Sequence, residues 1–269
     1  MAKVSFVMPV KNGEKTIRKT IESLINQTEK DIEIIIVNDH SEDKTVSIIE
    51  QIQKKDPRIV LLHSDKNGVG AARNFGTNRA EGDIILPTDG DDPNYPERAE
   101  VSLKELEQNK ADIFYSNLMR YFPEENNKEL RHFQPYEAKL LTMINFIAHS
   151  GSSAYYKYVF DKVGGYDEKI AIGEDWDFWL KAQETGYKFC YKNIPLSLYT
   201  MHAGQVTTTV DIEAIKKRQE WNKRVREKHK IFDIDPEYVK EHGTQEIVEF
   251  YVNKNYDIWF GGESIPRED

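Results

Sequence analysis

The chain has 269 residues, a formal charge of -9 and a pI near 5.4, which argue against a nucleic-acid-binding protein because such proteins usually present a basic surface. Its 39% hydrophobic residues suffice for a full core, and its single cysteine, Cys190, excludes an internal disulfide framework and a cysteine-based zinc site. No apolar run approaches the roughly 20 residues of a membrane span, and the N-terminus lacks the apolar core of a signal peptide. We therefore expect a cytoplasmic globular protein with a small or locally recognised substrate.

Short apolar segments alternate with helical patterns over the first hundred residues. Between the apolar segments, hydrophobic residues recur at helical spacing, as at Ile17, Ile21 and Leu24. The alternation predicts a Rossmann-like α/β sheet, mostly parallel and flanked by helices, with strands at 3–8, 32–38, 59–63 and 83–87. Ligands of such sheets bind beyond the carboxyl ends of the strands, so the loops that start at Pro9, Asp39, His63 and Thr88 should meet at one crevice.

The second half of the chain has a looser pattern. A helix at about 97–108 and a strand at 112–117 precede a polar stretch within 121–152, which is typical of an exposed loop or hairpin. From Asp211 onward the chain is highly charged and should be helical. Between these parts the pattern predicts the turn 164–168, a helix at 175–184, and strands at 187–191 and 196–201.

Three aspartates follow the strand 83–87 in the sequence "PTDGDD". Asp89 and Asp91 are two residues apart at the end of a strand, so their side chains should point to the same side. Sparse carboxylate oxygens suit Mg²⁺ or Mn²⁺ bound jointly with substrate phosphates. The alternative is a simple turn, because Asp, Gly and Pro are common turn residues.

Two other polar positions lie at the same predicted edge. Asp39 ends the most apolar strand, where its carboxylate can accept hydrogen bonds from a nucleobase or, alternatively, cap the next helix. In "NGVGAARNFG", the glycines allow close approach of a ligand, and Arg73 can reach a phosphate or base. This segment is no dinucleotide fingerprint, because Arg73 stands where the third glycine should be.

The sequence "GEDWDFWL" places Glu174 and Asp175 at the start of a helix with an inward face of Trp176 and Trp179. It suggests a general base beside a Trp-walled acceptor pocket, although acidic residues in a first turn also interact favourably with the helix dipole. His202 follows a strand in a loop of small polar residues, but a lone histidine is more often structural.

These stretches together resemble the inverting, nucleotide-sugar-dependent glycosyltransferases of family 2, which have the GT-A fold. The resemblance runs from about residue 3 to 207 and rests on seven motifs in the family's order. They are "VSFVMPVKNGEKTIRKTIESLINQT", "VNDHSEDKT", "NGVGAARNFG", "PTDGDD", "GGYDE", "GEDWDFWL" and "YTMHAGQVT". Each motif is weak alone, and their order makes the resemblance specific.

The resemblance implies a role for each candidate residue. Asp39 and the first loop would hold the base, usually uracil, of a UDP-sugar, Arg73 would contact the nucleotide, and Asp89 with Gly90 would meet the ribose or metal region. The first-loop residues are Pro9, Val10, Lys11 and Asn12.

Asp91 would ligate a divalent cation, Mn²⁺ or Mg²⁺, that bridges the diphosphate, with Asp89 and His202 close to it. Asp175, of the Glu174–Asp175 pair, would be the general base that removes the proton of the acceptor hydroxyl.

The same resemblance suggests a division of the chain. Residues 1–210 would form the glycosyltransferase domain, with a nucleotide-sugar-binding half at 1–117 and an acceptor-binding half at 118–210. Residues 211–269 would be a charged helical extension, in which the basic segment 216–230 is either a solvated helix or a peripheral contact to the inner face of a membrane or to a lipid-linked acceptor.

Some positions depart from the family pattern. Lys11 replaces a common tyrosine, and Thr200 replaces a basic residue often found two positions before the loop histidine. The Q-x-x-R-W pattern of processive members is absent, so we expect a hexosyltransferase of polysaccharide biosynthesis that transfers one or a few sugars. The competing hypotheses are a sugar nucleotidyltransferase, whose glycine- and arginine-rich first loop is missing here, and a non-catalytic nucleotide-sugar or glycan-binding domain.

Overall fold

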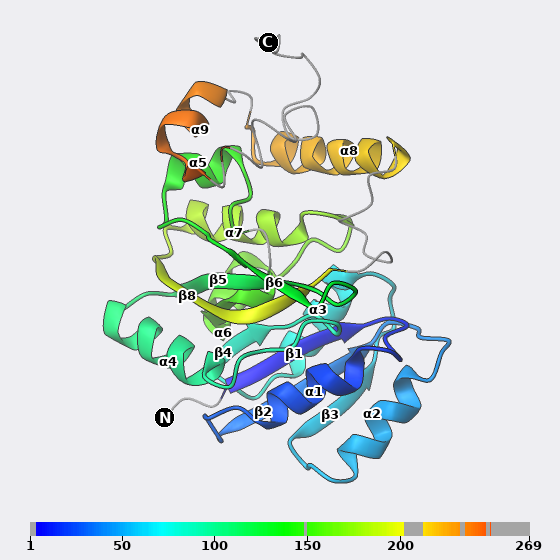
Figure 1. The fold of residues 1–269 in the computed structure, drawn as a ribbon. Coiled ribbons are helices and arrows are strands. Elements are labelled where there is room, and N and C mark those ends of the chain that lie inside the picture. The colour runs from blue at the N-terminus through cyan, green and yellow to red at the C-terminus, as the bar shows by residue number, and fades with distance from the viewer. Residues whose placement is uncertain (1–3, 148–149, 202–211, 232–234, 246–247, 249–269) are drawn as a thin grey trace.

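The computed structural model describes residues 4–147, 150–201, 212–231, 235–245 and 248. Its centre is a twisted sheet of eight strands in the order β3-β2-β1-β4-β7-β5-β6, with β8 paired to β5 (Figure 1). The strands are β1 (Val4–Val10), β2 (Ile32–Asn38), β3 (Ile59–His63), β4 (Ile84–Pro87), β5 (Ile113–Phe122), β6 (Asn127–Arg131), β7 (Ser153–Tyr156) and β8 (Phe189–Thr200). The predicted mixed α/β sheet flanked by helices is confirmed.

The four strands of the first half are parallel to one another, with β1 between β2 and β4. Every residue of β1 and β2 is buried, as expected for strands covered on both faces. The helices that connect these strands are α1 (Ile17–Ile25), α2 (Thr45–Gln53), α3 (Val69–Arg79) and α4 (Arg98–Asn109). The order of the strands reverses at β1, so the crevice of this sheet lies at the carboxyl ends of β1 and β4.

Alternation along the strands divides the core into two layers. Phe6 and Met8 of β1 pack with α1, α2 and α4 on one face of the sheet. Val7 of β1, with Ile35 and Val37 of β2, packs with α3 on the other face, in the cluster that also contains the aromatic residues of α7 (Glu174–Thr185). The helix that carries the predicted base thus lies on the α3 face.

The second half departs from the prediction in several elements. Strand β7 enters antiparallel between β4 and β5. The polar stretch after β5 forms the strand β6 of a hairpin, which agrees with the expected loop or hairpin. The two strands predicted at 187–191 and 196–201 are wrong, because β8 is one strand with irregular pairing to β5 around Asn117. Lys192 still pairs with Ser116 and Pro195 with Asn117, so the bulge takes up Asn193 and Ile194 without ending the strand.

Four further helices complete the described part of the chain. Two short helices, α5 (Ala138–Met143) and α6 (Lys157–Val163), were not predicted. The charged segment contains α8 (Ile212–Lys228) and α9 (Pro236–His242), which lie above α7 and α5 in Figure 1. In the described residues we find no helix that is both long and apolar enough to cross a membrane.

Gly76 allows α3 to approach the sheet closely. A Cβ atom at this position would lie 2.7 Å from Cγ1 of Val7 and 2.9 Å from Cγ2 of Val37, both in the core. We therefore expect Gly76→Ala to lower the free energy of unfolding by about 1–3 kcal/mol through overpacking, measured by urea denaturation.

Gly70 provides the matched control in the same helix. A Cβ atom there would lie 3.4 Å from the nearest atom, the carbonyl oxygen of Asp167, so Gly70→Ala should be neutral or stabilise by up to about 1 kcal/mol. Equal effects of the two substitutions would show that close packing at Gly76 does not limit stability.

Candidate active site

The loops after the parallel strands are tied together at one edge of the sheet. The amide of Asp39 donates to the carbonyl of Val10 at 2.8 Å, that of Ser64 to Asn38 at 3.0 Å, and that of Thr88 to Val7 at 3.0 Å. The predicted convergence of these loops at the carboxyl ends of the strands is therefore present.

The first loop is fastened to the loop after β2. Asn12 has a positive φ of 51°, its amide donates to Oγ of Ser41 at 3.0 Å, and its side-chain oxygen accepts from the amide of Glu42 at 2.9 Å. Lys11 and Asn12 are exposed, whereas Pro9 and Val10 are buried in β1. Of the four predicted first-loop residues, Lys11 and Asn12 are therefore the two whose side chains meet solvent.

Asp39 is buried and held at both carboxylate oxygens. Its Oδ2 accepts from the amide of Gly68 at 3.0 Å, and its Oδ1 lies 3.0 Å from Nδ1 of His40. The contact to Gly68 fixes Asp39 against the start of α3. A carboxylate oxygen can accept more than one hydrogen bond, so this anchoring leaves Asp39 able to accept from a ligand.

Residues 89–92 after β4, here called the aspartate turn, are fixed by contacts with β1 and β8. Gly90 allows it to approach β1, because a Cβ atom there would lie 2.9 Å from Cγ2 of Val10. Asp92 is buried, and its Oδ1 accepts from the amide of Thr200 at 2.7 Å. The hydroxyl of Thr200 donates to the carbonyl of Asp91 at 2.7 Å. Asp92 and Thr200 thus support the turn.

Arg98 is a second, deeper support of this turn. Its guanidinium is buried and donates to Oγ1 of Thr88 at 2.9 Å, to the carbonyl of Pro87 at 2.6 Å and to Oδ1 of Asn94. Burial lowers the pKa of Arg98 to about 9, against the opposing effect of Asp89 and Asp92. The backbone that presents Asp89 and Asp91 is therefore built around a buried cation.

Arg73 joins the aspartate turn to α7, the helix that carries the predicted base. From α3, its Nη2 donates to Oδ1 of Asp89 at 2.8 Å, and its Nη1 donates to Oε1 of Glu174. The Arg73 side chain is only 5% exposed, and burial acts to lower its pKa, but the carboxylates of Asp89 and Glu174 outweigh burial and raise it. Glu174 is likewise buried, so its carboxylate serves to hold Arg73.

Asp175 is half-buried at the first turn of α7. Its Oδ1 accepts from the amide of Trp176 at 2.7 Å and from Nδ2 of Asn145 at 3.1 Å, a residue of the irregular segment after α5. The indoles of Trp176 and Trp179 are completely buried, and Nε1 of Trp176 donates to the carbonyl of Leu141 at 2.8 Å. The prediction of a Trp-walled acceptor pocket is therefore wrong, because both rings belong to the core.

Asp177, also on α7, binds the end of α8. This fully buried carboxylate lies 2.6 Å from Nζ of Lys228, 2.9 Å from Nε2 of His229 and 3.2 Å from Nζ of Lys181. Burial acts to raise the pKa of Asp177, but hydrogen bonds from His229 and Lys228 outweigh it and bring the pKa to about 2. Burial acts to lower the pKa of His229, but its contacts with Asp177 and Glu184 raise it above the usual 6.5.

The metal prediction concerns Asp89, Asp91 and His202. Among the residues that the structure describes, there is no group of three or more His, Cys, Asp or Glu side chains placed to hold a metal ion. His202 lies outside the described residues. The two aspartates share one turn at the crevice, and their oxygens are the hard donors that Mg²⁺ and Mn²⁺ prefer. The residues present therefore fit a cation that takes its remaining ligands from elsewhere.

Several supporting residues were not found by the sequence argument. Arg98 and Asn145 belong to none of the seven motifs, and Asp177 lies in one without an assigned role; the roles of all three depend on contacts between residues far apart in the chain. For Asp177, the only available signal was its position two residues after Asp175 in "GEDWD".

Removal of the Arg73 cation should strongly destabilise the protein. In Arg73→Met, Asp89 and Glu174 lose the positive charge between them, so we expect the free energy of unfolding to fall by about 3–5 kcal/mol in urea titrations. The control Arg79→Met removes an exposed arginine of the same helix and should cost less than about 1 kcal/mol. Similar losses in both variants would contradict a structural role of the Arg73 pair.

The Asp177 cluster predicts a pH dependence of stability. Because the folded pKa of Asp177 is below its unfolded value, its contribution, roughly 2 kcal/mol, is present above about pH 4 and lost as the pH falls towards 2. Because the folded pKa of His229 is raised, its contribution is full below about pH 6.5 and lost as the pH rises through the folded pKa. Urea titrations across pH test both assignments. Asp177→Asn should remove the decline of the free energy of unfolding at acidic pH, and His229→Gln should remove its decline at alkaline pH. Unchanged pH profiles would contradict these assignments.

Comparison with known proteins identifies the family. The model for "Glycosyl transferase family 2" matches residues 5–164, more than half of the chain. An uncharacterized glycosyltransferase of Methanocaldococcus jannaschii is 38% identical over 194 residues, which cover 69% of this chain and 66% of the relative. The uncharacterized glycosyltransferase EpsJ of Bacillus subtilis is 34% identical, over 66% of this chain and 55% of EpsJ. The chain thus spans about half to two thirds of these relatives.

Solved structures agree with the fold. TarS of S. aureus in complex with UDP-GlcNAc aligns with a TM-score of 0.66 and 18% identity, covering 95% of this chain and 73% of the TarS chain. The mannosyltransferase PcManGT of Pyrobaculum calidifontis, in complex with GDP-Man and Mn²⁺, has a TM-score of 0.66 and 14% identity, covering 96% of this chain and 72% of that one. The GT-A fold and the match of the family model establish that the chain belongs to glycosyl transferase family 2.

Proposed function

We propose that this protein transfers a sugar from a nucleoside diphosphate sugar, UDP-linked, to a hydroxyl group of a glycan or lipid-linked acceptor, with inversion at the anomeric carbon. The observation that carries the proposal is the contact of Arg73 with both Asp89 and Glu174. Through it, the turn predicted to meet the donor and the helix with the predicted base meet at one point. A transferase needs this arrangement, because donor and acceptor must be held together.

The donor would lie along the carboxyl ends of β1, β2 and β4. Asp39 would accept a hydrogen bond from the base, with Lys11 and Asn12 at the entrance. TarS, which has the same fold, was solved with UDP and with UDP-GlcNAc, which supports a UDP-sugar. PcManGT was solved with GDP-Man, so a guanosine donor is the alternative to test.

Departure of the nucleoside diphosphate concentrates negative charge beside the aspartate turn. A divalent cation held by Asp91 and Asp89, Mn²⁺ or Mg²⁺, would supply Lewis-acid stabilisation of that charge. Arg73 would contribute in two ways: it holds Asp89 in place, and its positive charge lies beside the turn. His202 remains a proposed neighbour of the diphosphate.

Asp175 would act as the general base. An acceptor hydroxyl is a weak nucleophile at neutral pH, and a carboxylate that removes its proton during attack accelerates such steps by about 10²–10⁴-fold. Asn145 and the amide of Trp176 bind Oδ1 of Asp175 and so orient the carboxylate. A single displacement inverts the anomeric carbon and needs no carboxylate nucleophile.

The acceptor and the proposed membrane contact involve the segment 216–230. Several of its basic side chains are engaged within the chain: Lys228 binds Asp167 and Asp177, Arg224 binds Glu220, and Arg226 lies over the ring of Trp176. Contact with an anionic lipid surface or a lipid-linked acceptor would therefore fall to exposed residues such as Lys230.

The direct test is turnover of a panel of UDP- and GDP-sugars with Mn²⁺ or Mg²⁺, followed by release of the nucleotide. We expect slow release from a UDP-sugar even without an acceptor, and loss of at least about 100-fold in Asp91→Ala. Glu50 is an exposed carboxylate of α2, away from the loops at the carboxyl ends of the strands, so Glu50→Ala should keep most of the activity and serves as control. Absence of both binding and turnover across the panel would exclude the proposed activity.

The role of Asp175 needs a separate comparison. Asp175→Asn keeps the shape and the ability to accept from Trp176 but is a much weaker base, so transfer to an acceptor should fall by about 10²–10⁴-fold while binding of UDP stays unchanged. Equal turnover in the two proteins would assign the proton transfer to another group, or would indicate a binding domain without catalysis.

A further inference from the structure

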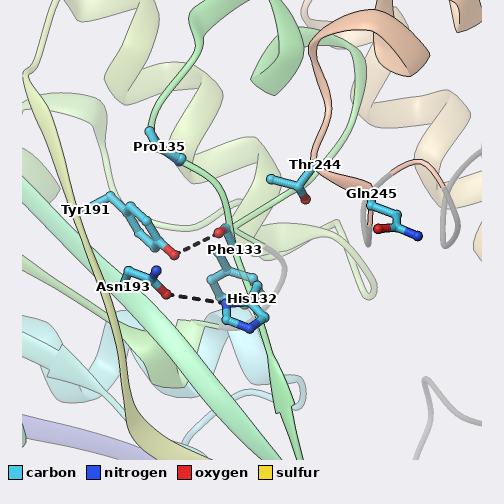
Figure 2. A pocket seen from close by; sticks show the side chains of 7 residues that line it. All are labelled: His132, Phe133, Pro135, Tyr191, Asn193, Thr244 and Gln245. Carbon is cyan, nitrogen blue, oxygen red and sulfur yellow. Dashed lines mark hydrogen bonds between the residues drawn. The ribbon is translucent and has the colours of Figure 1, made fainter.

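A cavity of about 720 Å³ lies apart from the residues assigned to donor and base. Figure 2 shows its walls: Tyr191 and Asn193 come from β8, His132 and Phe133 from the segment after β6, and Thr244 from the segment after α9. Pro135 and Gln245 complete the lining. The volume falls within the range of about 300–1,000 Å³ that is common for small-molecule sites.

The floor of this groove is fixed by hydrogen bonds among its own residues. The hydroxyl of Tyr191 lies 2.8 Å from the carbonyl oxygen of Phe133 and 2.7 Å from Oδ1 of Asn117, and it can donate its one proton to either acceptor. Nδ2 of Asn117, which is fully buried, donates to Oδ1 of Asn193 at 2.7 Å. The β8 bulge thus holds Asn193 at the groove in a defined orientation, and a preformed site loses little entropy when a ligand binds.

The chemistry of the lining selects for neutral polar ligands. None of the seven lining residues is Asp, Glu, Lys or Arg. The amides of Asn193 and Gln245 and the hydroxyl of Thr244 offer both donors and acceptors, as neighbouring sugar hydroxyls require. The ring of Tyr191 adds an apolar surface for the C–H face of a pyranose. A phosphate or a carboxylate would find no lysine or arginine among these side chains.

The groove lies on the same face of the sheet as α7, which carries Asp175. Asn117 and Tyr115 are two residues apart in β5 and so point to the same face, and Tyr115 belongs to the core cluster that contains Trp176 of α7. Further along β5, the carbonyl of Tyr121 accepts a hydrogen bond from the amide of Met201. The residue before Met201 is Thr200, whose hydroxyl binds the aspartate turn. Tyr121 lies four residues after Asn117 along the strand, a rise of about 13 Å.

We propose that this groove is a second saccharide site, which binds a neutral sugar unit of the acceptor glycan at a distance from the reacting hydroxyl. The identification of the ligand as an acceptor rests on the proposed transferase function. The lining contains none of the residues assigned to the donor or the base, so a ligand that fills the groove and also presents a hydroxyl to Asp175 must be longer than one sugar unit. The substrate class is therefore an uncharged oligosaccharide, longer than one unit.

The test is binding of trisaccharides to the full chain, measured by saturation-transfer NMR with UDP present to occupy the donor site. The probes are neutral trisaccharides built from glucose, galactose, mannose or N-acetylglucosamine, and one trisaccharide of uronic acids. We expect binding of at least one neutral probe and none of the charged probe. Failure of every neutral probe to bind, or preference for the uronic acids, overturns the proposal.

Variants at the rim locate the binding. The double variant Thr244→Ala/Gln245→Ala removes polar side-chain groups, keeps the backbone bond from Thr244 to Gln134, and should weaken binding at least about fivefold. The second variant, Gln245→Trp, narrows the groove and should also weaken binding. The control is Gln51→Ala, which changes an exposed glutamine of α2 and should leave the affinity unchanged. Equal affinities in all variants place the sugar elsewhere and overturn the proposal.

The two proposals fail in different ways. If nucleotide sugars are not consumed but a neutral trisaccharide binds and depends on Thr244 and Gln245, the transferase activity is wrong and the saccharide groove stands. If transfer occurs and its KM for the acceptor is the same in the double variant and the parent, the groove has no part in acceptor binding. A KM raised at least about fivefold with unchanged kcat supports the groove.

Discussion

The candidate active site depends on one buried cation, the guanidinium of Arg73. It lies between Asp89 of the aspartate turn and Glu174 of α7, the helix that also carries Asp175. A buried arginine is unfavourable without partners, and two buried or half-buried carboxylates are unfavourable without a cation, so the three groups require one another. This mutual requirement fixes the distance between the aspartate turn and α7, and hence the space in which a donor and an acceptor would meet.

Other polar contacts extend the same link between the two halves of the chain. Asn74, next to Arg73, exchanges two hydrogen bonds with the backbone of Tyr166 at 2.8 and 2.9 Å. Behind α7, Asp177 binds Lys228 and His229 at the end of α8. The charged helix α8 therefore contributes to the position of α7, and removal of α8 should displace Asp175.

Much of the first half of the chain could be predicted from the sequence, because β1, β2 and β4 are buried along their whole length and the apolar runs of its strands are nearly continuous. The strands 32–38 and 59–63 agree with β2 and β3 to the residue. Prediction was weaker where tertiary contacts decide the structure. Strand β8 continues through the bulge near Asn193, where the sequence predicts two strands. The helices α5 and α6 are too short to show a periodic pattern.

In the candidate site, too, local features could be predicted and contacts between distant residues could not. The turn signals around Asp89 and the acidic start of α7 are local features, so the sequence placed both correctly at element ends. The partners of these residues are distant in the chain: Arg73 meets Glu174 across 101 positions, and Thr200 meets Asp92 across 108. Likewise, the burial of Trp176 follows from the packing of α8 and α5 over α7, which no local pattern reveals.

A double-mutant cycle between Arg73 and Glu174 tests the central claim most directly. The free energies of unfolding of the parent, Arg73→Met, Glu174→Gln and the double variant give the coupling between the two side chains. A coupling of at least about 1 kcal/mol is predicted, because the pair is buried and each member compensates the other. Additivity of the two substitutions within about 0.5 kcal/mol would contradict the claim that this ion pair holds the aspartate turn and α7 together.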